Sequence, residues 1–312
     1  MSPGAPRGSA GVPASASASV PAPVPVPAAG PTAPPSGAAL WDEHASWWRA
    51  TFTDGADIEY EGEIIPLARR ELGSFARVLD LGCGEGQVAR ALAAGGASLI
   101  GLDPSRNQLA NASALGGGPS FVCAAGEWLP IATGSLDAVL CCLAIEHSDD
   151  TDAVLEEVAR VLAPGGTFLL LINHPMYQGP GSGFVDDQIL GEHYWRVGPY
   201  LTEQVSVEEV DSNVSIPFAH RPLSRYVNPL AALDVLLVAM FEPPPLEAFL
   251  ATSVDRELEG AIPRLLAMRF EHRPAPARPA ARRTAGRNAA GRGAAASGTP
   301  ARGAAPRRQR SG

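Results

Sequence analysis

The chain has 312 residues, 46% of them hydrophobic and 18% charged, and a formal net charge of −9. No apolar stretch reaches the roughly 18 residues of a membrane span, and prolines break up the N-terminal sequence, so neither a span nor a secretory signal is expected. Without its low-complexity ends the chain keeps about 230 residues, enough for one domain with a buried core.

The two ends of the chain differ in composition from the part between them. Residues 1–39 are mostly Pro, Ala, Ser and Gly with a single charge at Arg7, which predicts a disordered tail. Residues 273–312 contain ten arginines and no acid, and are also predicted to be disordered. This basic tail either rests loosely against its own acidic domain or anchors a nucleic acid. It has no interleaved aromatic residues for base stacking, which favours the first alternative.

The segment 41–72 opens the expected domain of residues 40–272. It holds three of the five tryptophans within eight residues, beside several acids. One interpretation is a helix that packs its aromatic side chains on the sheet. The other is a lid over a bound ligand, touched by Phe52, Asp57 or Tyr60, and the two are compatible.

A strand, a turn, a helix and a second strand follow. The apolar run 77–81 predicts the first strand, the glycines of 82–86 a tight turn, and 87–94 a helix. A second apolar run over 98–102 predicts a strand that ends in Asp103. In a parallel sheet, such a unit binds a nucleoside-bearing cofactor outside the carboxyl ends of its strands.

The glycine spacing and two acids narrow the choice of cofactor. Gly82, Gly84 and Gly86 give G-x-G-x-G, whereas a dinucleotide fingerprint is G-x-G-x-x-G. Asp80 precedes the first glycine by two residues, where it would repel a pyrophosphate and attract an ammonium group. Asp103 is placed to accept hydrogen bonds from ribose hydroxyls. We therefore expect a ligand with a cationic amino-acid end and a ribose.

At these residues the chain resembles the class I S-adenosylmethionine-dependent methyltransferases. Residues 80–86 are close to the first motif of that family, and Gly-Leu-Asp-Pro-Ser at 101–105 matches the second. Residues 126–131 look like the loop that covers the adenine, and 135–140 and 155–167 look like the next two blocks. The resemblance implies S-adenosyl-L-methionine as cofactor. It implies these cofactor-binding residues: Asp80, Gly82, Cys83, Gly84, Gly86, Asp103, Pro104, Glu127, Trp128 and Leu129.

Strands continue to alternate with helices, which predicts an α/β, Rossmann-like doubly wound sheet. Further strands are expected at 120–123, 138–143, 167–172, 235–241 and 264–270. Helices are expected at 154–162, ended by the Pro-Gly-Gly of 164–166, and at 223–233. The resemblance implies a seven-stranded, mostly parallel sheet with its last strand antiparallel. A hairpin near 203–220 interrupts the alternation, where this fold usually builds a substrate cover.

Three histidines are candidates for a catalytic base. Methyl transfer requires alignment of a nucleophile and exclusion of water, and an oxygen or carbon acid also requires a base. His147 follows the fourth predicted strand, His174 follows the fifth, and His220 ends the hairpin. We expect His147 or His174 to be catalytic, and His220 is the third candidate. Each could instead tie down a loop through backbone hydrogen bonds.

The four cysteines fall on or beside strands expected to be buried, with no metal-ligand spacing, and we expect no metal site. Cys141 and Cys142 should point to opposite faces of one strand. We expect reduced thiols in a cytoplasmic protein. Ala125 departs from the family, which usually has an aspartate there to recognise the adenine. The adenine amino group is then recognised by Glu127 or by a backbone carbonyl, or is not recognised.

The sequence predicts a methyltransferase acting on a small molecule. The short Pro-aromatic motifs of enzymes that methylate amino groups of DNA, RNA or protein are not found after the fourth strand. Segments 171–175, 194–200 and 220–226 look like the quinone-biosynthesis-like type. Tyr194, Trp195 and Tyr200 suit a planar apolar substrate or pack under a long loop. The alternatives are an RNA or tRNA methyltransferase that uses the basic tail, and a non-catalytic cofactor-binding protein.

Overall fold

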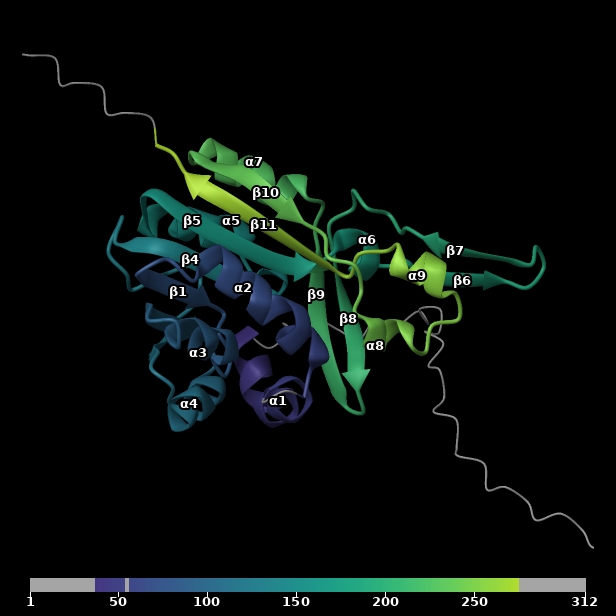
Figure 1. Ribbon diagram of the computed structural model, residues 1–312, viewed down its shortest axis with the longest axis horizontal. Helices are drawn as coiled ribbons and strands as arrows, with labels where there is room; N and C mark the ends of the chain where they lie inside the picture. Colours follow the sequence, from purple (N-terminus) through teal and green to yellow (C-terminus); the bar gives the residue numbers. More distant parts are fainter. Residues whose placement is uncertain (1–36, 54–55, 275–312) are drawn as a thin grey trace, which may run out of the picture. The chain divides into compact units, whose positions relative to one another are not determined.

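Seven strands form a single sheet at the centre of the fold (Figure 1). The computed structural model describes residues 37–53 and 56–274, so the predicted disordered tails lie outside the described residues, apart from 37–39 and 273–274. The strand order is β10-β11-β5-β4-β1-β2-β3. The bounds are Arg77–Leu81 (β1), Ser98–Asp103 (β2), Ser120–Cys123 (β3), Leu136–Cys142 (β4), Leu162–Asn173 (β5), Val235–Phe241 (β10) and Leu265–His272 (β11).

Strand β11 runs antiparallel to both of its neighbours, β10 and β5. The pairs formed by β1, β2, β3, β4 and β5 are all parallel. The predicted Rossmann-like sheet with an antiparallel last strand is therefore confirmed.

The prediction for β5 was too short at its beginning. Helix α5 (Thr151–Val161) ends at Val161 and the strand begins at once, five residues before the expected start at Thr167. The Pro-Gly-Gly segment of 164–166 therefore does not end the helix, as was predicted, but lies inside β5, where the β4–β5 register shifts between Leu136 and Ala138. Gly165 accommodates this irregularity with a positive φ of 81°.

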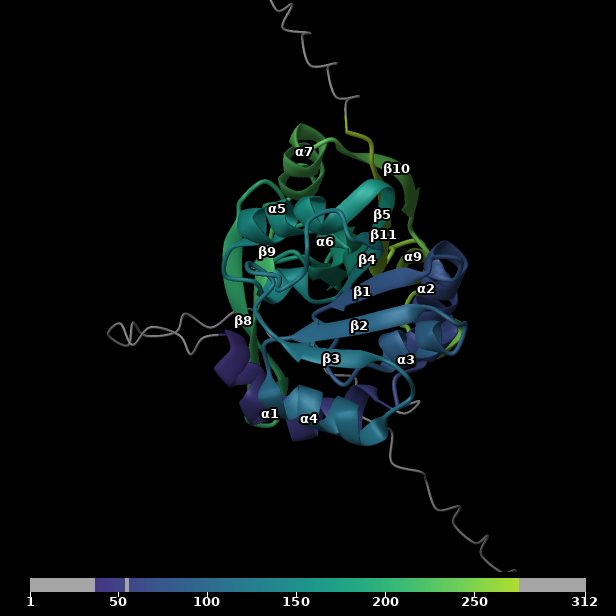
Figure 2. The ribbon, with the colours of Figure 1, turned by 90° about the vertical axis from the view of Figure 1, so that its left-hand side faces the viewer.

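Helices cover both faces of the sheet (Figure 2). On one face α5 and α7 (Ser224–Ala232) contribute to a core that contains Cys141 and Phe168. On the other, α2 (Ile65–Leu72) and α3 (Gln87–Ala93) contribute to a core that contains Cys142 and Leu140. The prediction that the two cysteines point to opposite faces is confirmed. Central strands buried on both faces explain the continuous apolar runs in the sequence.

Helix α1 (Gly37–Phe52) begins within the last three residues of the tail that was predicted to be disordered. It lies between α4 (Arg106–Leu115) and a hairpin of β8 (Gln204–Asp211) and β9 (Val214–His220), as Figures 1 and 2 both show. The hairpin confirms the predicted insertion near 203–220. Its tip is tied to α1 by Trp47, whose indole N–H donates to Asp211 Oδ2 at 2.9 Å.

A second hairpin, β6 (Gly183–Asp187) with β7 (Glu192–Arg196), was not predicted. Its strands are rich in charged side chains and lack the apolar alternation that marks a half-buried strand. The remaining short elements are η1 (Tyr60–Ile64), η2 (Ile145–His147), α6 (Pro175–Gln178), α8 (Glu247–Leu250) and α9 (Arg256–Gly260). Among the described residues, no helix has the length and apolar character needed to cross a bilayer.

Candidate active site

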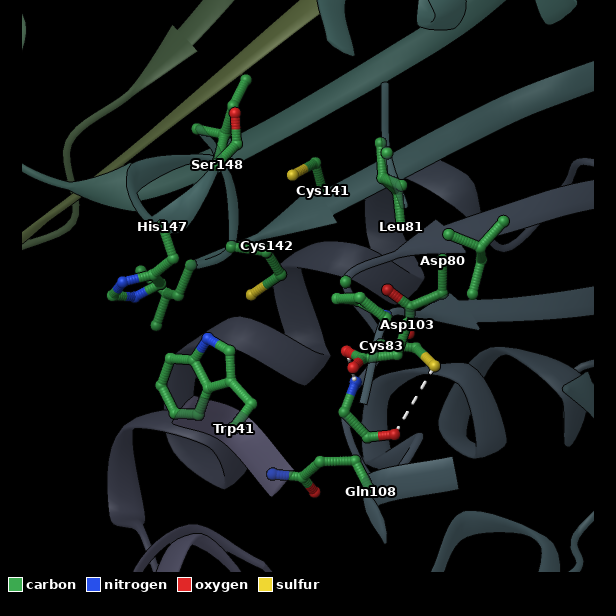
Figure 3. Close-up of a pocket in the computed structure, with 18 of the residues that line it drawn as sticks. Trp41, Asp80, Leu81, Cys83, Asp103, Gln108, Cys141, Cys142, His147 and Ser148 are labelled. Atoms are coloured by element: carbon green, nitrogen blue, oxygen red, sulfur yellow. Dashed lines mark hydrogen bonds between the residues drawn. The ribbon is translucent and has the colours of Figure 1, made fainter. Parts of the chain in front are cut away.

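A cavity of about 270 Å³ lies at the carboxyl ends of β1, β2 and β4. Its walls come from the glycine turn after β1, the end of β2, the loop after β4 and helix α1. Figure 3 shows Asp80, Asp103 and Cys83 on one side of this space and His147 and Trp41 on the other. The position agrees with the general location of ligand sites in open α/β sheets.

The glycine turn needs its glycines for two different reasons. Gly82 and Gly84 have positive φ values of 73° and 51°. A Cβ on Gly82 would lie 2.3 Å from the Cβ of Ala144, so a larger residue would collide with the loop after β4. A Cβ on Gly84 would meet nothing closer than 3.9 Å, where the side-chain ends of Gln108 and Trp48 line the same cavity. Gly84 therefore leaves room for a ligand close to the backbone.

Asp103 fastens the turn to the end of β2. Its Oδ2 accepts a hydrogen bond from the Gly84 N–H at 2.9 Å, and its Oδ1 accepts one from the Ser105 N–H at 2.8 Å. Ser105 is the N-cap of α4: its Oγ accepts from the Gln108 N–H at 3.1 Å and lies 2.6 Å from Asp42 Oδ1 of α1. These bonds set the positions of the turn, α4 and α1 relative to one another.

Replacing Ser105 with alanine should reduce the free energy of unfolding by about 1–2 kcal/mol, because it removes a buried N-cap and the link to Asp42. Urea unfolding measures this difference. Ser113→Ala in the same helix is the control, since that hydroxyl only bonds back to the Leu109 carbonyl at 2.7 Å and alanine is the better helix former. A loss for Ser105→Ala no larger than that for Ser113→Ala would contradict the linking role.

The two acids at the strand ends are buried and have raised pKa values. Burial raises the pKa of Asp80 to about 7, and the charge of Asp103 adds to the shift, while a backbone hydrogen bond from Ala89 opposes it. Burial raises the pKa of Asp103 to about 6, against the lowering effect of its backbone hydrogen bonds. A pair of this kind holds its negative charge poorly by itself, and a cationic ligand would favour the ionised form.

Four buried polar atoms of the cavity wall have no hydrogen-bond partner among the described residues. They are Thr53 Oγ1, Glu85 Oε2, Gln108 Oε1 and Ser148 Oγ. Since nearly all buried polar groups in native proteins are hydrogen-bonded, these four fit a ligand that carries several donors and acceptors. A nucleoside with an amino-acid end has such groups.

His147 is held in a fixed orientation on the wall opposite the acids. Its Nδ1 lies 2.9 Å from the carbonyl oxygen of Pro217 on β9, so Nδ1 carries the proton and Nε2 keeps its lone pair. Its ring contacts Trp41 and Phe218, with ring centroids 5.0 Å and 4.8 Å away. Burial lowers the pKa of His147 to about 4, so the imidazole is neutral at physiological pH.

The other two histidines lie outside this cavity. His174 caps α6: its Nδ1 accepts from the Met176 N–H at 3.1 Å, and its Nε2 lies 3.0 Å from Glu242 Oε1. His220 Nε2 lies 2.9 Å from the Tyr200 carbonyl oxygen. These contacts favour the interpretation of both side chains as loop anchors.

Most of the residues that the motifs implied for cofactor binding come together in the cavity. The residues on its wall are Asp80, Gly82, Cys83, Gly84, Asp103, Pro104 and Glu127. Gly86, Trp128 and Leu129 do not belong to it. Trp128 is 84% exposed, and Leu129 is part of the core under α5. Glu127 stands beside Ala125 and Gly126 on the wall and offers the nearby carboxyl group that Ala125 lacks.

Helix α1 was only partly recognised as part of the site. Trp41 and Trp48 line the cavity, and Trp48 also packs against the core over α2 and α3, so the packing and covering roles coexist. Of the residues proposed to touch the ligand, Tyr60 lines the cavity, whereas Phe52 and Asp57 do not. In the sequence, the cluster of tryptophans in this segment was the signal that α1 belongs to the site.

The aromatic residues after β6 pack away from the cavity. Trp195 stacks on Tyr177 at a centroid distance of 5.1 Å and donates to the Met176 carbonyl oxygen. Tyr200 accepts a hydrogen bond from the Leu223 N–H at 3.2 Å, and Tyr194 is 42% exposed. These positions favour packing under a loop over substrate contact.

Comparison with known proteins agrees with this geometry. Residues 79–170 match a family described as a methyltransferase domain. A ubiquinone biosynthesis O-methyltransferase from Rhizobium johnstonii is 31% identical over 185 residues, which cover 54% of this chain and 73% of that protein. A solved S-adenosylmethionine-dependent methyltransferase from Mesorhizobium loti has 27% identity and a TM-score of 0.56, over 66% of this chain and 96% of that one.

An uncharacterized methyltransferase from Mycobacterium ulcerans is 38% identical over 118 residues, which are 37% of this chain and 46% of that protein. The chain thus spans less than half of this relative and of two others. The sheet order, the acids at two adjacent strand ends and these similarities agree on S-adenosyl-L-methionine as the cofactor. The chain belongs to the class I S-adenosylmethionine-dependent methyltransferase family.

Proposed function

We propose that this protein transfers the methyl group of S-adenosylmethionine to a small-molecule acceptor and releases S-adenosylhomocysteine. The observation that carries the proposal is the pair of buried acids, Asp80 and Asp103, around a glycine turn at one cavity. The name of the Rhizobium relative ties that protein to ubiquinone biosynthesis, which supports a small acceptor here. We assign the activity to the domain predicted at residues 40–272 and to the cytoplasm, a location that four free cysteines support.

The cavity residues divide into roles by their chemistry. Asp80 would hold the ammonium group of the cofactor, Asp103 the ribose hydroxyls, and Glu127 the adenine side. The backbone of Gly84 leaves the space in which the cofactor approaches the turn. When bound, S-adenosylmethionine supplies a methyl group on a cationic sulfur, and transfer leaves the carbon–sulfur electron pair on sulfur while the acceptor atom bonds to carbon.

His147 acts on the acceptor in this proposal. Its Nε2 lone pair accepts a hydrogen bond from the acceptor hydroxyl, orients the oxygen lone pair, and takes the proton during transfer. Because its pKa is about 4, the imidazole stays neutral and able to accept throughout the physiological range. Trp41 on α1 and Phe218 on β9 pack on its ring and help exclude water from the transfer.

Calorimetric titration of the full chain with S-adenosylhomocysteine tests the proposal first. We expect a single site with a Kd on the order of micromolar, about −8 kcal/mol. Labelled S-adenosylmethionine is then offered with a panel of phenols and quinols. If neither S-adenosylhomocysteine nor S-adenosylmethionine bound, the proposed activity would be wrong.

His147→Asn should reduce methyl transfer by about 10²- to 10⁴-fold, the usual contribution of a positioned base. The asparagine amide still donates to the Pro217 carbonyl oxygen but has no group in the place of Nε2. Binding of S-adenosylhomocysteine should change by less than about threefold. His174→Asn is the matched control and should leave the rate nearly unchanged. If the two substitutions had equal effects on the rate, the assignment of the base to His147 would be wrong.

A further inference from the structure

The part of the cavity wall that the described residues form carries acids but no arginine. Five carboxyl groups line it, from Asp80, Glu85, Asp103, Glu127 and Asp149, and no arginine lines it within 37–53 and 56–274. The chain contains no lysine. We infer that the methyl acceptor is an uncharged planar molecule with a hydroxyl group, and that acceptors bearing a carboxylate or phosphate are excluded. This inference deepens the proposed function and rests on it.

The guanidinium of Arg221, near the loop after β4, belongs to a different cavity. Arg221 donates to the Ser148 carbonyl oxygen at 3.4 Å, but it lines a small second cavity together with Glu146 and Tyr226. The carboxyl group of Glu146 stands with it there, also buried. Arg221 therefore has an acidic neighbour of its own and does not open onto the first cavity.

An anionic acceptor would meet unfavourable electrostatics from the wall of this cavity. A buried charge is tolerated when it is paired, and an added carboxylate would face the acids of the wall without a partner. His147 does not supply the missing charge, because burial holds its pKa at about 4. The cationic sulfur of the cofactor favours an anion, but Asp80 and Asp103 already stand on that side of the cavity.

The hydrogen-bonding groups near His147 also select a neutral hydroxyl. The Nε2 lone pair can accept a proton donor, and an ionised carboxylate has none to offer at neutral pH. Ser148 Oγ, on the same loop, is buried with no partner in the described part of the chain and can donate to the oxygen of an alcohol or a phenol.

The shape of the wall favours a flat molecule. Trp41 and Trp48 meet edge to face, with centroids 5.4 Å apart and planes at 89°. Trp41 meets His147 in the same way, at 78° between planes. The two indole rings form an aromatic wall beside the imidazole that can contact a planar apolar ligand.

Two matched probes test the inference: 1-naphthol and 1-naphthoic acid, titrated at pH 7.5 into the full chain saturated with S-adenosylhomocysteine. We expect 1-naphthol to bind at least about 30-fold more tightly than the naphthoate, a difference of about 2 kcal/mol. Equal binding, tighter binding of naphthoate, or binding of neither probe to the saturated protein would overturn the inference. Failure of S-adenosylhomocysteine itself to bind would instead overturn the proposed function.

Two variants locate the effect in the wall. Asp149→Arg places a cation at the exposed acid of the cavity and should tighten naphthoate binding by at least about fivefold, with less than about a twofold change for 1-naphthol. Trp41→Ala should weaken 1-naphthol by about tenfold and leave S-adenosylhomocysteine within about threefold. Unchanged discrimination in Asp149→Arg would show that charge does not select the acceptor.

Discussion

Gly82→Ala is expected to lower the free energy of unfolding by about 2–5 kcal/mol and to disturb the loop after β4. The left-handed φ of 73° costs an alanine about 1–2 kcal/mol. The new methyl group would also lie 2.3 Å from the Ala144 Cβ, so the turn or the loop after β4 must move, and such overpacking costs about 1–3 kcal/mol. Because that loop continues into His147, the damage extends to the site.

Urea unfolding gives the stability, and Gly165→Ala separates the two causes. Gly165 has a similar φ of 81°, but a Cβ there meets nothing within 4 Å. Gly165→Ala should therefore lower the free energy of unfolding by only about 1–2 kcal/mol, the cost of the left-handed backbone conformation alone. If Gly82→Ala were no less stable than Gly165→Ala, the predicted clash with Ala144 would not contribute to the loss of stability.

Asp80→Asn is expected to weaken binding of S-adenosylmethionine by about 100-fold or more. Removing one partner of a buried, hydrogen-bonded charge pair costs about 2–5 kcal/mol, and the asparagine leaves the cofactor ammonium without its counter-charge. Calorimetry at pH 8 measures the loss. Asp149→Asn is the control for a general change of charge, because that acid is exposed and should have an effect below about threefold.

The same carboxyl group should make cofactor binding depend on pH. With a pKa of about 7, Asp80 is largely protonated below neutrality and must lose its proton to pair with an ammonium. Affinity should therefore fall as pH falls through 7, and binding at pH 6.5 should release a proton, seen as a dependence of the calorimetric heat on the buffer. Asp80→Asn should abolish this release; a release that persisted would assign it to another group.

Stability without the cofactor should have the opposite pH dependence. Between about pH 4 and pH 7 the folded protein keeps a proton on Asp80 that the unfolded chain has lost. The folded state is therefore favoured at the acidic end of this window and loses stability as pH rises through it. An acid that binds a cation is thus destabilising until the cation arrives, which is the pattern of a binding residue.

The part of the fold that the sequence predicted is the part determined by local pattern. The runs that became β1 and β3 have the predicted bounds, because each is a short run of mostly apolar residues next to a polar or glycine-rich turn. The β6–β7 hairpin was missed because its stability does not come from an apolar face of its own. Trp195, for example, is held by a stack on Tyr177 from α6, a contact that no local pattern encodes.

The site shows the same division. Asp80, Gly82, Gly84 and Asp103 were identified because motif spacing alone brings them to the ends of two adjacent strands. Gln108 was missed because it lies in α4, outside the motifs. It lines the cavity because Ser105 caps α4 beside it, a contact that the sequence alone does not show. Trp128 and Leu129 were assigned to the cofactor site from the resemblance to the family's adenine loop. The side chain of Trp128 is instead exposed to solvent, and that of Leu129 lies in the core.

The two sides of the cavity come from parts of the chain that the family pattern covers to different extents. The acids and the glycine turn lie within residues 79–170, the segment that the shared family pattern covers. Trp41 and the strand that holds His147 come from α1 and the β8–β9 hairpin, which lie before and after it. In the roles proposed above, mutations in α1 and in the β8–β9 hairpin are expected to change acceptor recognition more than they change the strand ends around Asp80 and Asp103.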